Sequence, residues 1–361
     1  MRLADLLGHD RVRAILSRAL ERDRLPPALL FAGPDGVGKK AVALAVAQAA
    51  LCERAPVPEP CGECRACRKV SAAVAPERLE ELRSAADQHP DEDVWRNFRL
   101  HPDLVLAEGW WLTKTGRPRA EPEIRVEQVR DLIGEIAGAP FEARRRVFVI
   151  DDAHSMNEAA QNALLKSLEE PPPRSHVILV SAAPLRLRQT IRSRCQMLRF
   201  GPLTRSAVAA HLVEGLGVPP EDARTRAALA GGSLGAALAF ESGAYGRMRA
   251  GLVDLLERAE ALDPAARLEA AEALEQTEDP ALLLTTLRSL LRDLLALRVG
   301  ASREALVHGD LADRLAPLAS GRLGDEAALL AERTGEARFA LRGFANKLLT
   351  FDLLVDSLAG D

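Results

Sequence analysis

Several groups of residues in this 361-residue sequence have types and spacings that could do chemistry, and the first is a glycine-rich loop. The segment that starts at Gly33 matches the phosphate-binding pattern G-x-x-x-x-G-K, with an apolar run before it and a helical run after it. Glycines let backbone N–H groups point inward at a phosphate, and the helix N-terminus adds positive charge. An ordinary glycine-rich turn is the alternative. The candidate nucleotide-binding residues of the loop are Gly33, Gly36, Gly38 and Lys39.

Three charged residues determine what such a loop can do with a nucleotide. The pattern requires Ser or Thr after its lysine, because a hydroxyl there binds Mg²⁺, but this chain has Lys40. A second apolar run ends in Asp151, which is suited to the hydration shell of Mg²⁺. Asp152 follows where a catalytic Glu would activate water, and it is one methylene shorter. We therefore expect weak binding of ATP or ADP without hydrolysis; two acids that simply end a strand are the alternative.

The second group consists of four cysteines within sixteen residues, Cys52, Cys61, Cys64 and Cys67. Four thiolates complete the tetrahedral coordination of Zn²⁺, which gives a closed structural site. The total of five cysteines is odd, so it cannot form a complete disulfide framework, and the clustering favours metal or redox chemistry in a reducing compartment. We predict structural zinc, with redox and iron–sulfur chemistry as the alternatives.

The third candidate is the tripeptide Ser193-Arg194-Cys195, about a dozen residues after a predicted buried strand. An arginine at this place could reach the nucleotide of a neighbouring subunit and stabilise charge on the transferring phosphoryl group. In an arginine-rich chain, a solvated helix face is the alternative. Cys195, outside the cluster, is expected to be a small buried residue.

Composition restricts the class of protein. The chain is 47% hydrophobic and 28% charged, as globular proteins are, and its formal net charge of −4 excludes a surface covered by nucleic acid. A local basic patch stays compatible with that charge. No apolar run approaches about 18 residues, so we expect no membrane span, and the N-terminus does not resemble a signal peptide. The expected location is the cytoplasm.

The elements that must position these residues follow from periodicity. Residues 1–50 and 124–200 read as strands alternating with helices, which indicates an α/β domain with a parallel sheet. Between them, the charged stretch 75–100 reads as an insertion, a solvated and partly disordered loop with one short helix. Residues 113–122 read as a loop or hairpin tip. Residues 201–361 are predicted to be helical, a small bundle followed by a larger one.

The motifs and their order resemble a known family. The phosphate loop and the four cysteines are followed by His101-Pro-Asp, by Ile-Asp-Asp-Ala-His at 150–154, and by Asn-Ala-Leu-Leu-Lys-Ser-Leu-Glu-Glu-Pro-Pro from 162. Ser-Arg-Cys closes the set. Together they resemble the clamp-loader subunits of bacterial DNA polymerase III, members of the AAA+ superfamily. The resemblance is dense over residues 1–205 and continues thinly to a last helix near 346–354.

Two subunit types share these motifs, a motor (gamma/tau) that hydrolyses ATP and a stator (delta prime) that generally does not. The sequence departs from the motor pattern at Lys40, at Asp152, at Ser181-Ala182-Ala183 where a motor has its polar sensor, and at Gly235 where a motor has a lid arginine. All these departures remove nucleotide chemistry, whereas Arg194 is kept. The sequence therefore resembles the stator type most.

The resemblance implies an architecture and partners. It implies an AAA+ domain at 1–202 with an inserted zinc module at 52–67, a small helical lid at 203–243 and a helical collar for oligomerisation at 244–361. The implied partners are the gamma/tau and delta subunits, with the sliding clamp and primed DNA reached through the assembled loader in the replisome. Arg194 would then complete the ATP site of the adjacent motor subunit.

Two other classes of protein stay open. One is an active AAA+ ATPase, either a motor-type loader subunit or a relative of the branch-migration helicases; Mg²⁺-dependent hydrolysis distinguishes it. The other is a zinc-dependent nucleic-acid-binding module with a vestigial phosphate loop, which would show a steep dependence of affinity on salt.

Overall fold

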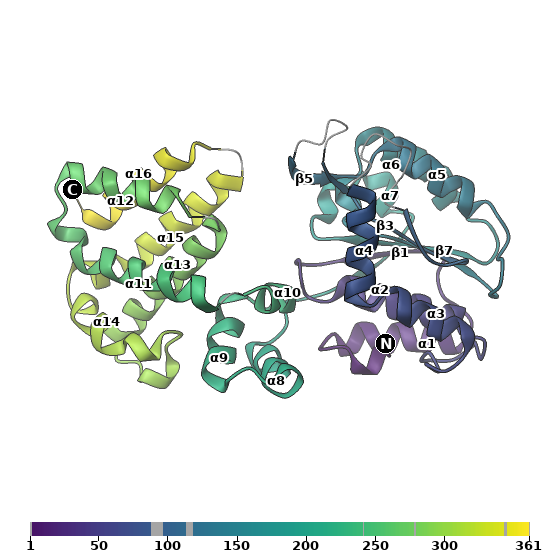
Figure 1. Ribbon diagram of the computed structural model, residues 1–361, viewed down its shortest axis with the longest axis horizontal. Helices are drawn as coiled ribbons and strands as arrows, with labels where there is room; N and C mark the ends of the chain where they lie inside the picture. The colour runs from purple at the N-terminus through teal and green to yellow at the C-terminus, as the bar shows by residue number, and fades with distance from the viewer. Residues whose placement is uncertain are drawn as a thin grey trace. The chain divides into compact units, whose positions relative to one another are not determined.

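The computed structural model describes residues 2–87, 97–112, 118–240, 242–277, 279–342 and 345–360. The chain divides into two compact units (Figure 1). The first consists of residues 1–207 together with 232–235, and the second of 208–231 together with 236–361. No helix within the described residues is long and apolar enough to cross a membrane.

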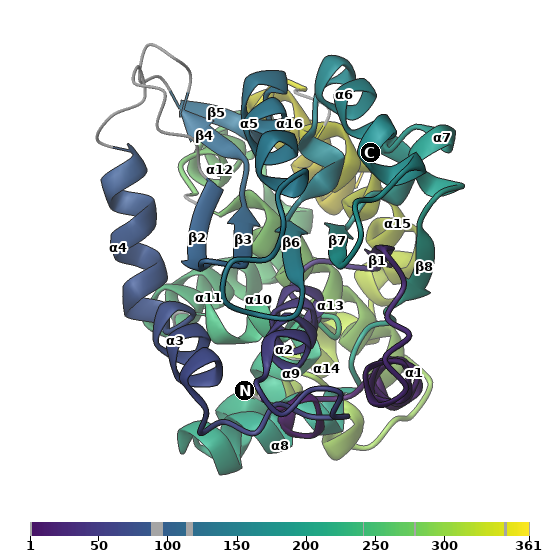
Figure 2. The ribbon, with the colours of Figure 1, turned by 90° about the vertical axis from the view of Figure 1, so that its right-hand side faces the viewer.

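The first unit is built on a six-stranded sheet (Figure 2). The strands, in their order across the sheet, are β2 (Asn97–His101), β3 (Leu104–Ala107), β6 (Arg146–Ile150), β7 (Ser175–Ser181), β1 (Ala28–Ala32) and β8 (Gln196–Arg199). All neighbours pair in parallel except β2 and β3, which are antiparallel. The carboxyl ends of five parallel strands therefore lie along one edge, which is where ligands bind in open α/β sheets.

Helices pack on both faces of this sheet, and alternate residues of each strand face different cores. Leu29 and Phe31 belong to one hydrophobic cluster, whereas Leu30 belongs to the other. Burial on both faces explains why these strands are continuous apolar runs rather than alternating ones. The first cluster includes residues of α1 (Asp10–Glu21), α2 (Lys39–Leu51), α3 (Arg65–Ala73) and α4 (Pro76–Asp87); the second includes α5 (Val126–Ile136), α6 (Glu158–Glu169) and α7 (Gln189–Arg192).

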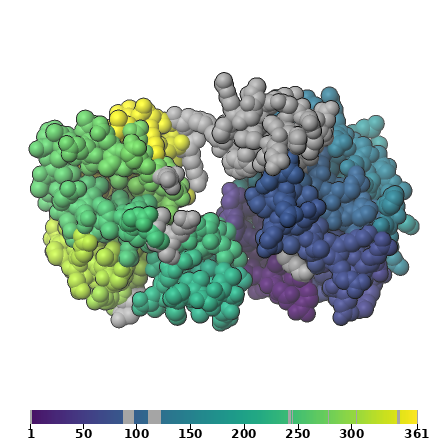
Figure 3. Space-filling model, viewed as in Figure 1, coloured from purple at the N-terminus to yellow at the C-terminus, as the bar shows by residue number. Residues whose placement is uncertain are grey.

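The charged stretch 75–100 differs from the loop that the sequence predicts. Residues Pro76–Asp87 form the amphipathic helix α4, which packs into the first core through Leu79 and Ala86. Residues Asn97–His101 form the edge strand β2. The prediction of a solvated loop was wrong here because a few apolar side chains in a charged stretch suffice to bury one helix face. Residues 88–96, also part of that prediction, lie outside the described residues. Figure 3 shows the blue atoms of α3 and α4 at the surface of this unit.

The predicted loop or hairpin tip at 113–122 is shorter than expected, because residues 118–122 form most of a strand. Strand β4 (Trp110–Leu112) pairs antiparallel with β5 (Pro118–Glu123), in the register that joins Trp110 to Glu123 and Leu112 to Pro118. The tip itself, 113–117, lies outside the described residues. The sequence reasoning missed three strands of the main sheet, β2, β3 and β8, each of five residues or fewer.

The regular elements of the second unit are all helices within its described residues, as predicted for the region from 201 on. Its core contains Leu287, Leu291 and Phe351, which are fully buried among leucines and alanines from several helices. The helices of this region are α8 (Arg205–Leu216), α9 (Pro220–Leu229), α10 (Leu234–Leu238), α11 (Ser242–Arg258), α12 (Pro264–Glu275), α13 (Pro280–Arg298), α14 (Ala312–Ala319), α15 (Arg322–Arg342) and α16 (Lys347–Ala359).

Candidate functional site

The phosphate loop lies between β1 and α2, as the sequence predicts. Gly36 and Gly38 have φ values of 69° and 100°, a conformation that side-chain-bearing residues rarely adopt. A Cβ on Gly33 would lie 2.1 Å from the carbonyl oxygen of Phe200, which explains why this position is also a glycine. The segment 232–235 closes on the loop, since the amide of Gly235 donates to the carbonyl of Gly36 at 2.9 Å. The backbone of segment 232–235 therefore packs directly against the phosphate loop.

Lys39 is folded back into this loop. Its buried ammonium group donates to the carbonyl oxygens of Gly33 at 2.8 Å and Pro34 at 2.6 Å. The carboxylate of Asp35 lies 3.8 Å away. Burial lowers the pKa of Lys39 below its usual value, although the neighbouring carboxylates oppose that shift. The Lys39 ammonium group, which would bind a phosphate in an active loop, is thus hydrogen-bonded to carbonyl oxygens of the loop itself.

Lys40 lies among carboxylates at the carboxyl edge of the sheet. Its ammonium group is 2.9 Å from a carboxylate oxygen of Asp151 and also forms an ion pair with Glu108. Burial alone would lower the pKa of Lys40, but Asp151 and Glu108 outweigh burial and raise it. A divalent cation at this place would have to displace the ammonium group from Asp151. The residues present therefore do not fit Mg²⁺ as they stand.

Glu108 also binds Arg83 of α4, which donates to its two carboxylate oxygens at 2.9 and 2.8 Å. Burial alone would raise the pKa of Glu108, but the hydrogen bonds from Arg83 and the charge of Lys40 lower it to about 2. Sequence reasoning missed both residues. Glu108 directly follows β3, and β3 pairs in parallel with β6, which Asp151 follows; that shared edge was the available signal. Arg83 lies in the short helix expected within the charged insertion, and no local pattern marks it as a partner of Glu108.

Replacing Glu108 by Gln is expected to lower the free energy of unfolding at pH 7 by about 3 kcal/mol, because two half-buried cations lose their shared, buried carboxylate. The pKa of about 2 in the folded chain is below the unfolded value of 4.5. The contribution is therefore fully present above pH 4.5 and is lost as the pH falls toward 2. Urea unfolding of the wild type, Glu108→Gln and the exposed control Glu127→Gln across this range measures it. Equal stability of Glu108→Gln and the wild type at pH 7 would contradict the network.

Asp152, the predicted neighbour of Asp151, has a left-handed backbone conformation with a φ of 46°. Burial, followed by the charges of Asp151 and Asp35, raises the pKa of its carboxyl group to about 6. A carboxyl group that is partly protonated near neutral pH is a weaker metal ligand than an ionised one. This position thus holds a carboxyl group that is one methylene shorter than the Glu of an ATPase and harder to ionise than an ordinary Asp.

The four clustered cysteines form one compact group. Their sulfurs all lie within 4.8 Å of one another, and the Sγ atoms of Cys61 and Cys67 are 3.9 Å apart. A tetrahedron with Zn–S bonds of about 2.3 Å places its sulfurs about 3.8 Å apart. The amide of Cys64 donates to the sulfur of Cys61 at 3.3 Å and, with burial opposing it, lowers the pKa of that thiol to about 6. The group could hold a metal such as zinc.

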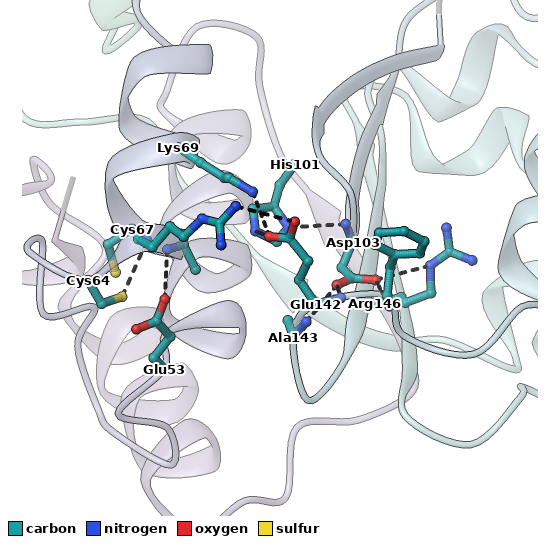
Figure 4. A network of polar contacts seen from close by, with 12 residues as sticks. Glu53, Cys64, Cys67, Lys69, His101, Asp103, Glu142, Ala143 and Arg146 are labelled. Carbon is teal, nitrogen blue, oxygen red and sulfur yellow. Dashed lines mark hydrogen bonds and ion pairs between the residues drawn. The ribbon is translucent and has the colours of Figure 1, made fainter.

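The cysteine group is attached to both the phosphate-loop helix and the sheet. Cys52 directly follows α2, and Gln48 of that helix donates to the carbonyl of Cys67 at 2.9 Å. On the other side, Lys69 of α3 points at Glu142 and donates to its carboxylate at 2.6 Å (Figure 4). The module is therefore fixed between α2 and the loop that precedes β6.

The motif His101-Pro-Asp has a structural explanation in the same network. The buried carboxylate of Asp103 accepts hydrogen bonds from the backbone amides of Phe141 at 2.6 Å and of Glu142 and Ala143 at 2.7 Å (Figure 4). Three amides on one carboxylate fix the path of this loop. The loop leads into β6, whose carboxyl end carries Asp151.

Arg194 lies apart from the phosphate loop of its own chain. Its guanidinium group forms an ion pair with Glu169 at 2.6 Å and donates to the carbonyl of Thr190 at 2.9 Å, and its side chain is 34% exposed. Ser193 donates to the same carbonyl at 3.1 Å. Cys195 is buried, and burial raises the pKa of its thiol to about 12. Glu169, from the long motif that begins at 162, was not anticipated as its partner.

Comparison with known proteins decides the family. The sequence model of the family described as "DNA polymerase III, delta subunit" matches residues 8–204, which is more than half of the chain. The chain belongs to this family. The matched region of this clamp-loader family chain includes the phosphate loop, the cysteine group and Arg194.

Relatives of this clamp-loader chain include both subunit types. It is 37% identical to the delta′ subunit of DNA polymerase III from Pseudomonas aeruginosa over 183 residues, 51% of this chain and 45% of that protein. It is 30% identical to subunit tau from Bacillus subtilis over 211 residues, 58% of this chain and 31% of that protein. The chain thus spans less than half the length of these relatives. A solved structure of a gamma subunit-related protein from Thermotoga maritima covers 96% of the chain and 98% of its own, with 14% identity and a TM-score of 0.36.

Proposed function

We propose that this chain is the stator-type subunit of the DNA polymerase III clamp loader, the delta prime type, and does not turn over ATP itself. In this role it helps to load the sliding clamp on primed DNA. The single observation that carries the proposal is the ion pair of Lys40 with Asp151 at 2.9 Å. The chain's own cation lies on the carboxylate that would hold the Mg²⁺ hydration shell in a motor.

Two further observations support the proposal. Lys39 is bound by the carbonyls of Gly33 and Pro34, so its charge is already compensated inside the loop. Gly235 contacts the backbone of Gly36, where a lid arginine could not be accommodated without a shift: even a Cβ at 235 would lie 3.1 Å from that Cα. These features weaken nucleotide chemistry within the chain and leave Arg194 intact.

We further propose that Arg194 acts on the ATP of an adjacent motor subunit, with Ser193 and Cys195 holding its backbone in place. Its exposed fraction and its surface ion pair with Glu169 are compatible with transfer to a phosphate of another chain. The gamma/tau and delta subunits are the proposed partners, and the sliding clamp and primed DNA are reached through them. In this proposal residues 1–202 form the AAA+ domain with a zinc module at 52–67, 203–243 the lid and 244–361 the collar.

The nucleotide prediction tests the non-hydrolysing part. We expect the purified chain to bind ADP weakly through Lys39, and Mg²⁺ to leave that affinity unchanged because Lys40 already neutralises Asp151. In Lys40→Ser, Mg²⁺ is expected to tighten binding by about tenfold, since a hydroxyl ligand and a free carboxylate become available. Titration calorimetry with and without Mg²⁺ measures this, with Lys39→Ala as the control that abolishes binding.

The alternative is a motor-type, catalytically active subunit, which the similarity to tau from Bacillus subtilis favours. Steady Mg²⁺-dependent ATP turnover by the wild-type chain, lost in Lys39→Ala, would establish it. Co-purification with gamma/tau and delta subunits, followed by a clamp-loading assay with and without this chain, tests the membership of the complex. Failure of the chain to enter such a complex would overturn the proposed function.

A further inference from the structure

Strand β8 is an open edge of the main sheet. It lies at one end of the strand order and pairs on one side only, with β1 (Figure 2). The amide of Phe200 donates to the carbonyl of Ala32 at 2.8 Å. Because peptide groups alternate in direction along a strand, those of Met197 and Arg199 face away from β1. No strand in the described part of the chain pairs with that outer side, so β8 presents free backbone donors and acceptors.

A groove of about 280 Å³ lies beside this edge, between α1 and β8. Its floor is apolar, formed by Leu16 of α1, Leu29 of β1 and Leu198 of β8. Ile15, 39% exposed, stands at its rim. Apolar side chains of a bound segment could therefore be buried here.

Three exposed arginines line the same groove, Arg18 on α1, Arg22 directly after its last residue and Arg24 in the turn that follows. Arg22 lies one helical turn beyond Arg18, since its amide donates to the Arg18 carbonyl at 3.2 Å. Among the described residues, none that lines the groove is acidic. Two acids adjoin these arginines in sequence, Glu21 and Asp23, and neither lines the groove. Asp23 forms an ion pair with Arg145. The lining of the groove is thus positively charged.

We propose that this α1/β8 groove binds an extended, acidic segment of a partner protein, which adds to β8 as a further strand. Its backbone would pair with the outward peptide groups of Met197 and Arg199, as in other cases of strand addition to a sheet edge. Alternate side chains would enter the apolar floor, and carboxylates would meet Arg18, Arg22 and Arg24. This inference does not depend on the nucleotide state or on Arg194.

The groove is less well suited to nucleic acid. Phosphates would satisfy the arginines, but no described aromatic side chain lines the groove for base stacking. A nucleic-acid backbone would also leave the peptide groups of β8 and the leucine floor unused. The combination of open edge, apolar floor and basic rim matches an acidic peptide on all three counts.

The test uses the full chain and fluorescence anisotropy. The probe is a labelled peptide of about eight residues that alternates Glu and Val, compared with its Lys/Val counterpart and with single-stranded DNA. We expect saturable binding of the acidic peptide only. The double variant Arg18→Glu/Arg22→Glu should weaken binding by about tenfold or more, whereas the matched variant Arg247→Glu/Arg288→Glu, at exposed sites of the second unit, should not.

Strand addition is tested at Met197. Met197→Pro removes the outward N–H, which edge strands tolerate, and should weaken binding by about tenfold, whereas Met197→Ala retains the N–H and the affinity. Thermal unfolding of both variants checks that the sheet is intact. No binding of the acidic peptide, equal binding of the basic peptide, DNA binding that alone depends on Arg18 and Arg22, or full affinity in a folded Met197→Pro would each overturn the proposal.

Discussion

Replacing Arg194 by Ala in a reconstituted clamp loader is expected to slow ATP hydrolysis at the adjacent motor site by about 10³-fold or more. The physical reason is that a guanidinium group supplied by a neighbouring chain stabilises the charge of the transferring phosphoryl group. In this chain alone, the group is occupied by Glu169 at 2.6 Å and by the carbonyl of Thr190 at 2.9 Å. When the loader assembles, Arg194 must leave the carboxylate of Glu169 and bind phosphate oxygens of the neighbouring nucleotide, which accept hydrogen bonds from a guanidinium group equally well.

The control for Arg194→Ala is Arg188→Ala. Arg188 precedes the same short helix α7, is exposed and forms a surface ion pair with Glu158, so its loss changes charge and stability to a similar extent. DNA- and clamp-stimulated phosphate release of the two assemblies is the measurement, with native mass spectrometry to establish that each variant still assembles. Arg194→Lys keeps the charge without the planar fork and should recover only part of the rate. A wild-type rate in Arg194→Ala would refute the proposed role.

Removal of the metal from the cysteine group is expected to lower the free energy of unfolding by several kcal/mol. Four thiolates at tetrahedral spacing are brought together by the fold, and metal binding to such a site is folding free energy. The site fixes Cys52 at the end of α2 and Cys64 at the start of α3, where its sulfur accepts from the amide of Cys67 at 3.4 Å. Loss of metal should therefore loosen 52–67 and speed its proteolysis.

Elemental analysis of freshly purified protein should find one zinc per chain, and chelation should lower the melting temperature. Cys64→Ser should lose the metal, whereas Cys195→Ser, which changes the one cysteine outside the group, should retain it. A metal-free wild type with an unchanged melting temperature under chelation would show that the four thiols serve another purpose.

The fold could be predicted from sequence where the signal was local. The strands at 28–32 and 146–150 are continuous apolar runs, and the phosphate loop and the four cysteines have spacings set by their own chemistry. Glu108 could not be placed so simply, because its partners Lys40 and Arg83 are 68 and 25 residues away in sequence. Such contacts depend on strand order, which periodicity does not give.

For the departures from the ATPase pattern too, the sequence predicts the local feature but not the contacts between residues far apart in the chain. Sequence alone indicated that Lys40 is unsuited to a Mg²⁺ site, since its ammonium group and the metal are both positively charged and repel each other. It did not indicate that the ammonium group would lie on Asp151, or that an arginine from the charged insertion would complete the network. The short strand β8, of four residues, was missed because it is too brief to show a period.

Helix α2 joins the two chemical sites directly, and this restricts how the chain can change in length. Its first residue, Lys39, belongs to the phosphate loop, and the residue after its last, Cys52, belongs to the thiol group. One residue inserted or deleted between them would rotate everything downstream by about 100° and shift it by about 1.5 Å. The thiol would then leave its three counterparts, and the buried face of the helix would turn out of register. Natural variants of this chain should accordingly differ in length before Gly33 or between Cys52 and Cys61, and keep the interval 39–52 constant.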